Sequence, residues 1–193
     1  CKFSNALKDN GAKNVDIQNE FYIYFPLQFQ PEATVDIRSP FYNNQLETIR
    51  QISMRLSGEL KLFVKEHPSM IDKRTPSYLK KISKLPNVTL LSNSLNPIEV
   101  IKKSFCVISL SGTSIFQASI LNKHSIQLGN YGITSFFPNV HKISNYDEIP
   151  NKIKIIKKNL LVNSIDDIKF IYFLKSLNEL GIKDDYYNVT ERW

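Results

Sequence analysis

The stretch FYIYFP at residues 21–26 decides the fold class of this 193-residue chain. Five apolar or aromatic side chains follow one another with no polar residue between them, and Pro26 ends the run. A strand whose residues are apolar on both faces is buried on both faces, which is typical of parallel sheets covered by helices. The stretch therefore predicts an α/β domain.

Shorter apolar runs alternate with helical segments along the rest of the chain. Asn44 and Asn96 are predicted helix N-caps, because Glu47 and Glu99 stand three residues after them. This alternation predicts a doubly wound, Rossmann-like parallel sheet over residues 21–145. The further strands are expected at 60–64, 88–91, 105–110 and 125–128, and the helices between them begin near Asn44, Thr75, Asn96 and Thr113.

The two ends of the chain differ from this central pattern. Residues 1–20 are polar and are predicted to be a lead-in or linker. Loops are expected from Gln28 to about Asn43 and from Gly129 to about 145. Residues 146–193 are predicted to be C-terminal helices (about 147–159 and 164–180) and a tail of the same domain. Because the chain does not begin with Met and its first strong strand starts near Phe21, we expect a fragment whose N-terminal half is missing.

Composition narrows the possible partners and the compartment. A net charge of +7 favours anionic partners such as sugar nucleotides or lipid head groups. Cys1 and Cys106 form neither a disulfide framework nor a metal-binding pattern, so we expect a reducing cytoplasm. The sequence has no stretch of about 20 apolar residues, and we expect no signal peptide because its first residues have no apolar run.

Four lysines in the region of the first C-terminal helix leave a further possibility open. They suit either a solvated helix face or a peripheral contact with the anionic inner membrane. Nucleic acid is not an expected partner, because the lysines are spread along helices and no aromatic and basic surface is evident. The four are Lys152, Lys154, Lys157 and Lys158.

Three polar clusters follow predicted strands at their carboxyl ends. In an open parallel sheet these ends share one edge, and ligands bind in the crevice beyond it. We therefore expect the three clusters to lie close together. They are Gln28, Gln30, Pro31 and Glu32 after the first strand, Lys65, Glu66, His67 and Pro68 after the second, and Ser111, Gly112, Thr113 and Ser114 after the fourth.

The residue types in two of these clusters are suited to a phosphate. Gly112 would let a phosphate approach the backbone, and the helix beside it would direct N–H groups at the crevice. Lys65 and His67 add a cation and an imidazole, on the same side if strand geometry continues. Each cluster alone is also explained as an ordinary helix cap or a solvated turn, but together they predict a nucleotide-phosphate site. His124 and His141 lie in loop-like contexts and are expected to be structural.

Three motifs in this order carry a resemblance to a known family. FPLQFQPEAT (25–34), VKEHP (64–68) and SGT (111–113), the last followed by a helix and GN (129–130), make the chain similar to the capsular polysaccharide biosynthesis family, which includes the Kdo transferases of capsule assembly. The His-Pro pair and the hydroxyl motif also resemble those of bacterial sialyltransferases that use CMP-sialic acid. The resemblance covers residues 21–145. It implies a GT-B architecture of two Rossmann-like domains, with this chain as the C-terminal, donor-binding half. It also implies no metal and no cofactor, with the nucleotide sugar as a substrate, which agrees with the lack of a carboxylate cluster in the sequence.

The resemblance also implies roles for individual residues. His67, Ser111 and Thr113 would hold the donor phosphate, with Lys65, Pro68, Gly112 and Ser114 beside it, and Gln28 and Gln30 would line the cleft. Glu32 and Glu66 are the candidates for a catalytic base in this chain, although the base is expected on the missing half. The family often has a Glu-Ala pair where this chain has Gln117-Ala118. Gln117 can still bind a ribose hydroxyl, but without the charge.

The function that follows from the resemblance is glycosyl transfer in bacterial capsular or surface polysaccharide synthesis. The donor would be a nucleotide sugar, with a CMP-linked sugar among the expected donors, and the acceptor a glycan or a lipid-linked glycan. Two alternatives stay open. One is a non-catalytic binding module of a polysaccharide assembly complex. The other is a sugar-nucleotide 2-epimerase, which usually has more acidic residues and a Gly-Gly motif where this chain has Gly112-Thr113.

Overall fold

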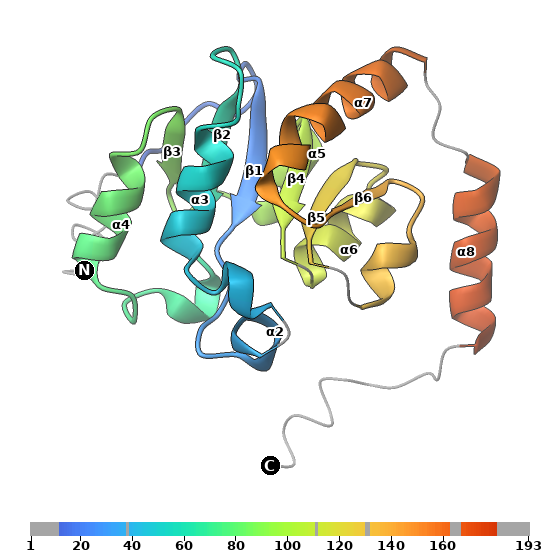
Figure 1. Ribbon diagram of the computed structural model, residues 1–193, viewed down its shortest axis with the longest axis horizontal. Helices are drawn as coiled ribbons and strands as arrows, with labels where there is room; N and C mark the ends of the chain where they lie inside the picture. Colours follow the sequence, from blue (N-terminus) through green and yellow to red (C-terminus); the bar gives the residue numbers. More distant parts are fainter. Residues whose placement is uncertain (1–11, 38, 111, 130–131, 163–166, 181–193) are drawn as a thin grey trace.

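The computed structural model describes residues 12–37, 39–110, 112–129, 132–162 and 167–180. In these ranges the strands form one parallel six-stranded sheet in the order β3-β2-β1-β4-β5-β6, with helices on both faces (Figure 1). The predicted Rossmann-like α/β class is confirmed. The strands are β1 (Tyr22–Pro26), β2 (Lys61–Lys65), β3 (Val88–Leu91), β4 (Cys106–Ser109), β5 (Ser125–Leu128) and β6 (Val140–Ile143).

This strand order places the switch point of the sheet between β1 and β4. β1 pairs with β2 on one side and with β4 on the other, so that Phe25 lies opposite Val64 and Tyr24 opposite Val107. The chain adds strands outward from this point in opposite directions. The connections after β1 and β4 therefore diverge, and an open crevice forms beyond the carboxyl ends of these two strands, where Rossmann-like domains bind nucleotides.

Two of the helices begin at the predicted caps. The side chain of Asn44 accepts a hydrogen bond from the backbone N–H of Glu47, and that of Asn96 accepts one from Ile98 rather than from Glu99. Both caps satisfy N–H groups that the first turn of a helix leaves without a partner. The α-helices are α2 (Ala33–Asp36), α3 (Gln45–Ser53), α4 (Pro76–Ser83), α5 (Pro97–Lys103), α6 (Thr113–Ile120), α7 (Ile149–Val162) and α8 (Asp167–Leu180). The 3-10 helices are η1 (Pro40–Tyr42), η2 (Pro68–Met70), η3 (Ile133–Phe136) and η4 (Tyr146–Glu148).

Different helices cover the two faces of β1. Tyr24, on one face, belongs to the same buried cluster as Val100 of α5 and Ala118 of α6. Phe25, on the other face, belongs to a cluster to which α3, α4 and α7 contribute, including Ile156. All five residues of β1 are buried. This two-sided burial is the physical reason for its uninterrupted apolar run.

The structure corrects the prediction of a plain loop at two places. The stretch from about 129 to 145 contains β6, an edge strand that pairs in parallel with β5. Val140 and Ile143 of β6 are buried but Lys142 is exposed, so this strand lacks the continuous apolar run that marks a central strand. The stretch between Gln28 and Asn43 contains α2 and η1.

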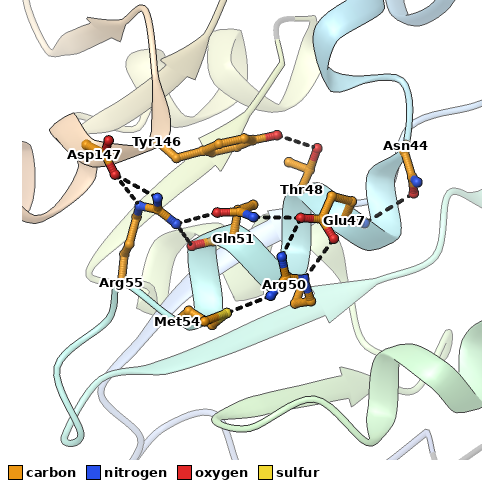
Figure 2. A network of polar contacts seen from close by, with 9 residues as sticks. All are labelled: Asn44, Glu47, Thr48, Arg50, Gln51, Met54, Arg55, Tyr146 and Asp147. Atoms are coloured by element: carbon orange, nitrogen blue, oxygen red, sulfur yellow. Dashed lines mark hydrogen bonds and ion pairs between the residues drawn. The ribbon is translucent and has the colours of Figure 1, made fainter.

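The segment after β6 is attached to the core through α3 (Figure 2). The Thr48 and Tyr146 hydroxyl oxygens lie 3.0 Å apart, and a nitrogen of Arg55 lies 2.6 Å from a carboxylate oxygen of Asp147. Ile149, at the start of α7, is fully buried in the main core. Residues 146–162 are therefore packed on the same core as the sheet.

The region predicted as a lead-in also contacts the sheet where the structure describes it. Lys13 forms a parallel bridge with Leu91, and the side chain of Ile17 is buried. Residues 1–11 lie outside the described ranges. The described part of this region therefore extends the β3 side of the domain.

Helix α8 packs on the domain through aromatic side chains. The ring centroid of Phe173 lies 4.6 Å from that of Phe137, which is buried beside α6. Residues 164–166 of the predicted helix and residues 181–193 of the predicted tail lie outside the described ranges. Within those ranges, no helix combines the length and the hydropathy needed to cross a membrane.

Two histidines lie side by side at β5 and β6. Nδ1 of His124 is 3.2 Å from Nε2 of His141, and the ring centroids are 5.3 Å apart. Burial lowers the pKa of His124. Burial, together with the nearby His124 and Lys152, lowers the pKa of His141 to about 4. The His141 ring is therefore neutral in the folded protein at neutral pH.

We expect the free energy of unfolding to fall as the pH is lowered from about 6.5 to about 4. In this window the unfolded chain binds protons on these histidines and the folded chain does not, so acid favours unfolding. His141 should account for about 2–3 kcal/mol of this loss. Urea unfolding at the two ends of the window measures it. His141→Gln cannot titrate and should lose correspondingly less, whereas equal losses in both proteins would contradict the prediction.

Candidate functional site

A cleft of about 650 Å³ opens beyond the carboxyl ends of β1, β2 and β4. It lies at the switch point, where the topology predicts a ligand site. All three polar clusters found in the sequence contribute to it, together with the loop after β5. The lining residues are Tyr24, Pro26, Leu27, Gln28, Phe29, Glu32, Lys65, Glu66, His67, Pro68, Pro97, Ile98, Gly112, Thr113, Ser114, Phe116, Gln117, Gly132, Ile133 and Thr134.

The amino end of α6 forms one wall of the cleft. Gly112 caps this helix with φ of 90°, a left-handed conformation that residues with a Cβ rarely adopt. Gly112 provides no side-chain hydrogen bond to the first turn, and Thr113 and Ser114 of that turn line the cleft. A helix has its unbonded N–H groups and the positive end of its dipole at this terminus. The predicted site residue Ser111 lies outside the described ranges.

A buried ion pair supports the opposite wall. Nε of Arg74 lies 2.9 Å from Oε2 of Glu66, and the two side chains are 8% and 3% exposed. Arg74 also donates to the backbone carbonyl of Gln28 at 2.8 Å, and its guanidinium lies 5.1 Å from the ring centroid of Tyr78. It therefore joins the loops that follow β1 and β2. Arg74 is a positioning residue that the sequence alone did not indicate, because it lies outside the strand-end motifs.

His67 presents one ring nitrogen to the cleft. Its Nδ1 accepts a hydrogen bond from the backbone N–H of Ser69 at 3.2 Å. The backbone N–H of His67 donates to Oε1 of Glu66 at 2.8 Å. In the neutral ring the proton is therefore on Nε2, which is a hydrogen-bond donor. Burial lowers the pKa of His67; nearby Glu32 works against this and Arg74 adds to it. Pro68 follows directly and starts η2, which provides the Ser69 N–H.

Lys65 is a buried cation with few partners. Lys65 is 3% exposed, and its Nζ donates a hydrogen bond to the backbone carbonyl of Asn93 at 3.4 Å. The nearby Glu66 carboxylate is already paired with Arg74. Burial lowers the pKa of Lys65, and Glu66 partly offsets the effect. Both Lys65 and His67 line the cleft.

The two predicted cleft-lining glutamines have different positions. Gln28 lines the cleft, and its amide donates to the Ser109 hydroxyl at 3.1 Å, which bridges β1 and β4. Gln30 is not among the lining residues of this cleft. Its amide nitrogen donates to Asp36 at 3.0 Å and to the Asn43 carbonyl at 2.9 Å, and its oxygen accepts from Gln45. Gln30 therefore organises the loop behind the cleft.

The two candidate bases also differ. Both oxygens of Glu66 are engaged, one by Arg74 and one by the His67 N–H, and the residue is 4% exposed. Burial raises the pKa of the Glu66 carboxyl, and the charge of Arg74 partly offsets this effect. Glu66 is thus a structural anion in this geometry. The exposed Glu32 lines the cleft, and its carboxylate makes no hydrogen bond or ion pair with another described residue.

The cleft combines these polar groups with apolar surface. Phe29, Phe116 and Ile133 line it, and Gln117 faces it from the second turn of α6. Among the described residues, no group of three or more His, Cys, Asp or Glu side chains is arranged to hold a metal ion. The geometry provides donors and a cation for an anionic group and apolar walls for a ring system.

Comparisons with known proteins show a likeness in structure. No protein-family model matches the sequence. A search of curated proteins also finds no match. KpsC from Thermosulfurimonas dismutans, a beta Kdo 2,7 transferase, matches 74% of this chain and 44% of its own, with 18% identity and a TM-score of 0.52.

Two further solved structures are similar to this chain. The glycotransferase of kitacinnamycin matches 89% of this chain and 42% of its own, with 12% identity and a TM-score of 0.50. A structure of accessory secretory proteins 1, 2 and 3 from Streptococcus pneumoniae matches 86% and 32%, with 14% identity and a TM-score of 0.50. This chain spans less than half the length of each of the three. Identities this low bear on the fold alone. The sheet order and these structural matches show that the chain has the Rossmann-like fold of one half of a GT-B glycosyltransferase.

Proposed function

We propose that the chain is the donor-binding half of a glycosyltransferase and that its cleft holds the diphosphate or monophosphate of a nucleotide sugar. The observation that supports this most directly is the convergence of three different anion-binding groups on one cleft at the switch point. These groups are the Nε2 donor of His67, the uncapped start of α6 at Gly112 and the buried ammonium of Lys65. The apolar walls at Phe29 and Phe116 suit the nucleoside.

The proposed chemistry is transfer of the sugar to an acceptor hydroxyl. The bond between the anomeric carbon and the phosphate oxygen breaks, and negative charge grows on that oxygen. Donors that are already in place around the phosphate stabilise this charge without reorganising. His67, Lys65 and the N–H groups of α6 would provide this stabilisation. A capsular or surface polysaccharide is the proposed destination of the sugar.

The acceptor proton requires a base, and the described residues offer one carboxylate for it. Glu32 lines the cleft without a hydrogen-bonding partner, whereas Glu66 is paired inside the wall. The base is therefore either Glu32 or a residue of the other half of the enzyme. The chain spans less than half the length of the similar structures, which leaves room for a second domain to provide the acceptor site.

We expect His67→Ala to weaken the binding of a uridine or cytidine nucleotide at least tenfold. A hydrogen bond to a charged group contributes about 1.5–3 kcal/mol, which corresponds to a factor of ten or more. Titration calorimetry with CMP and with UDP measures the change. Unaltered affinity for both nucleotides would exclude His67 from the phosphate site.

A second variant separates the charge of His67 from its hydrogen bond. His67→Gln can place an amide donor near the position of Nε2 but cannot titrate. A bound phosphate raises the pKa of His67 above its value in the free protein, so the affinity of the wild type should fall as the pH rises through that higher pKa. The Gln variant should keep part of the affinity and lack the pH dependence that is due to His67.

Two features favour a second candidate, a nucleotide-binding module without catalysis. Gln117 stands where the family has a glutamate, and Glu66 is committed to Arg74. This candidate predicts the same nucleotide binding but no transfer or hydrolysis when the chain is combined with its other half. Release of free nucleotide from a nucleotide sugar distinguishes the two.

A further inference from the structure

The outer face of α7 has an unusual combination of side chains. Lys154, Lys157 and Lys158 are exposed, and the helix contains no Asp or Glu. Ile155, which is 37% exposed, lies beside Lys154 and Lys158 on this face. Leu160, which is 47% exposed, lies one turn beyond the buried Ile156 at the border of the face. Three of the four predicted lysines thus lie on the surface together with apolar residues.

An aromatic side chain from another part of the chain extends this face. Phe21, directly before β1, is 42% exposed, and Nζ of Lys157 lies 5.6 Å from its ring centroid. Its ring also packs edge-on against the buried Phe105, with centroids 5.1 Å apart. We call Phe21, Lys154, Ile155, Lys157, Lys158 and Leu160 the α7 surface.

The positive charge of the α7 surface is not neutralised within the described ranges. The ion pairs of these ranges include none of its three lysines. The acidic Glu20, adjacent in sequence to Phe21, is paired with Lys61 at 2.5 Å. The whole chain has a net charge of +7, which adds to the attraction for an anionic partner.

We propose that the α7 surface binds the anionic head groups of a phospholipid bilayer. Lysines near such a surface are attracted by its negative potential, and apolar side chains between them can enter the head-group region. A nucleic acid would provide phosphates for the lysines but no apolar layer for Ile155, Leu160 and Phe21, so the bilayer is the partner that suits both kinds of side chain.

The position of the surface leaves the cleft accessible. Phe21 directly precedes β1 and contacts Lys157, so the α7 surface lies toward the amino edge of the sheet. Figure 1 shows α7 running toward that edge, and the cleft residues lie beyond the carboxyl ends of the strands. A membrane bound at the α7 surface would therefore hold the domain without covering the cleft. The proposal does not depend on the nucleotide site.

Co-sedimentation of the whole chain with vesicles tests the proposal. Vesicles of phosphatidylglycerol and phosphatidylcholine should bind the chain, and vesicles of phosphatidylcholine alone should not. The double variant Lys154→Glu and Lys158→Glu should weaken binding to the anionic vesicles by at least about thirty-fold, because each lost lysine charge costs about 1 kcal/mol and each new carboxylate is repelled. The matched control is Lys80→Glu with Lys84→Glu on the exposed face of α4, which changes the net charge equally and should have a much smaller effect.

Each other result counts against the proposal. Equal losses in the two double variants would mean that net charge alone drives binding. Tighter binding to a short DNA duplex than to anionic vesicles would identify nucleic acid as the partner. Unchanged binding after Leu160→Ser combined with Ile155→Ser, measured at high salt where the lysines are screened, would remove the apolar contribution that distinguishes a bilayer.

Discussion

Arg74→Ala is expected to lower the free energy of unfolding by about 3–5 kcal/mol, because it leaves the Glu66 carboxylate buried without its cation. The two side chains are almost fully buried, and the pair is 2.9 Å long. The variant also removes the donor to the Gln28 carbonyl. For a chain of this size the change corresponds to a decrease in melting temperature of about 10 °C.

Two controls show whether the unpaired charge is the cause. Glu66→Gln in the Arg74→Ala background removes the charge but can still accept from the His67 N–H, so it should restore a large part of the stability. Lys102→Ala breaks an exposed pair, with side chains 48% and 46% exposed, and should cost about 1 kcal/mol or less. If urea unfolding gave Arg74→Ala and Lys102→Ala similar costs, the buried pair would not be the support of the cleft wall.

The strands that could be predicted from the sequence are those whose buried positions produce a recognisable run of residues in the sequence. β1 and β4 consist of apolar, aromatic or small residues that are all buried. The limits predicted for β3 and β5 also agree with the structure, although Val88 and Thr89 of β3 are half-buried and β5 contains the polar Gln127. β6 is an edge strand with one exposed and one half-buried residue in four, so its four-residue pattern resembles a loop. Its place in the sheet depends on pairing with β5, which is a tertiary contact and has no local signal.

The candidate site likewise has features that the sequence predicts and features that depend on tertiary contacts. The meeting of the three clusters could be predicted, because parallel strands end at one edge. The directions of individual side chains could not, since they depend on partners elsewhere in the chain. Gln30 turns away to Asp36 and Gln45, and Glu66 turns to Arg74, which is eight residues later in a polar segment. Neither contact has a periodicity that a sequence pattern can reveal.

Lys65→Met is expected to have opposite effects on binding and on stability. Lys65 is 3% exposed and has one hydrogen bond, at 3.4 Å, so its ammonium is costly to bury in the free protein. Met has a similar volume and no charge, and should leave the free energy of unfolding unchanged or raise it. The same substitution removes the cation from the phosphate site, so the affinity for UDP should fall about ten- to hundred-fold.

Lys61→Met, at the other end of β2, is the matched control. Lys61 is exposed at the amino edge, where it pairs with Glu20, and its replacement should change the affinity for UDP less than about twofold. A protein selected for stability alone would not keep a poorly paired ammonium in its interior. If Lys65→Met lowered the stability and left the affinity unchanged, Lys65 would be part of the scaffold. Loss of affinity at equal or higher stability would show that the folded chain carries this buried charge for a bound anion.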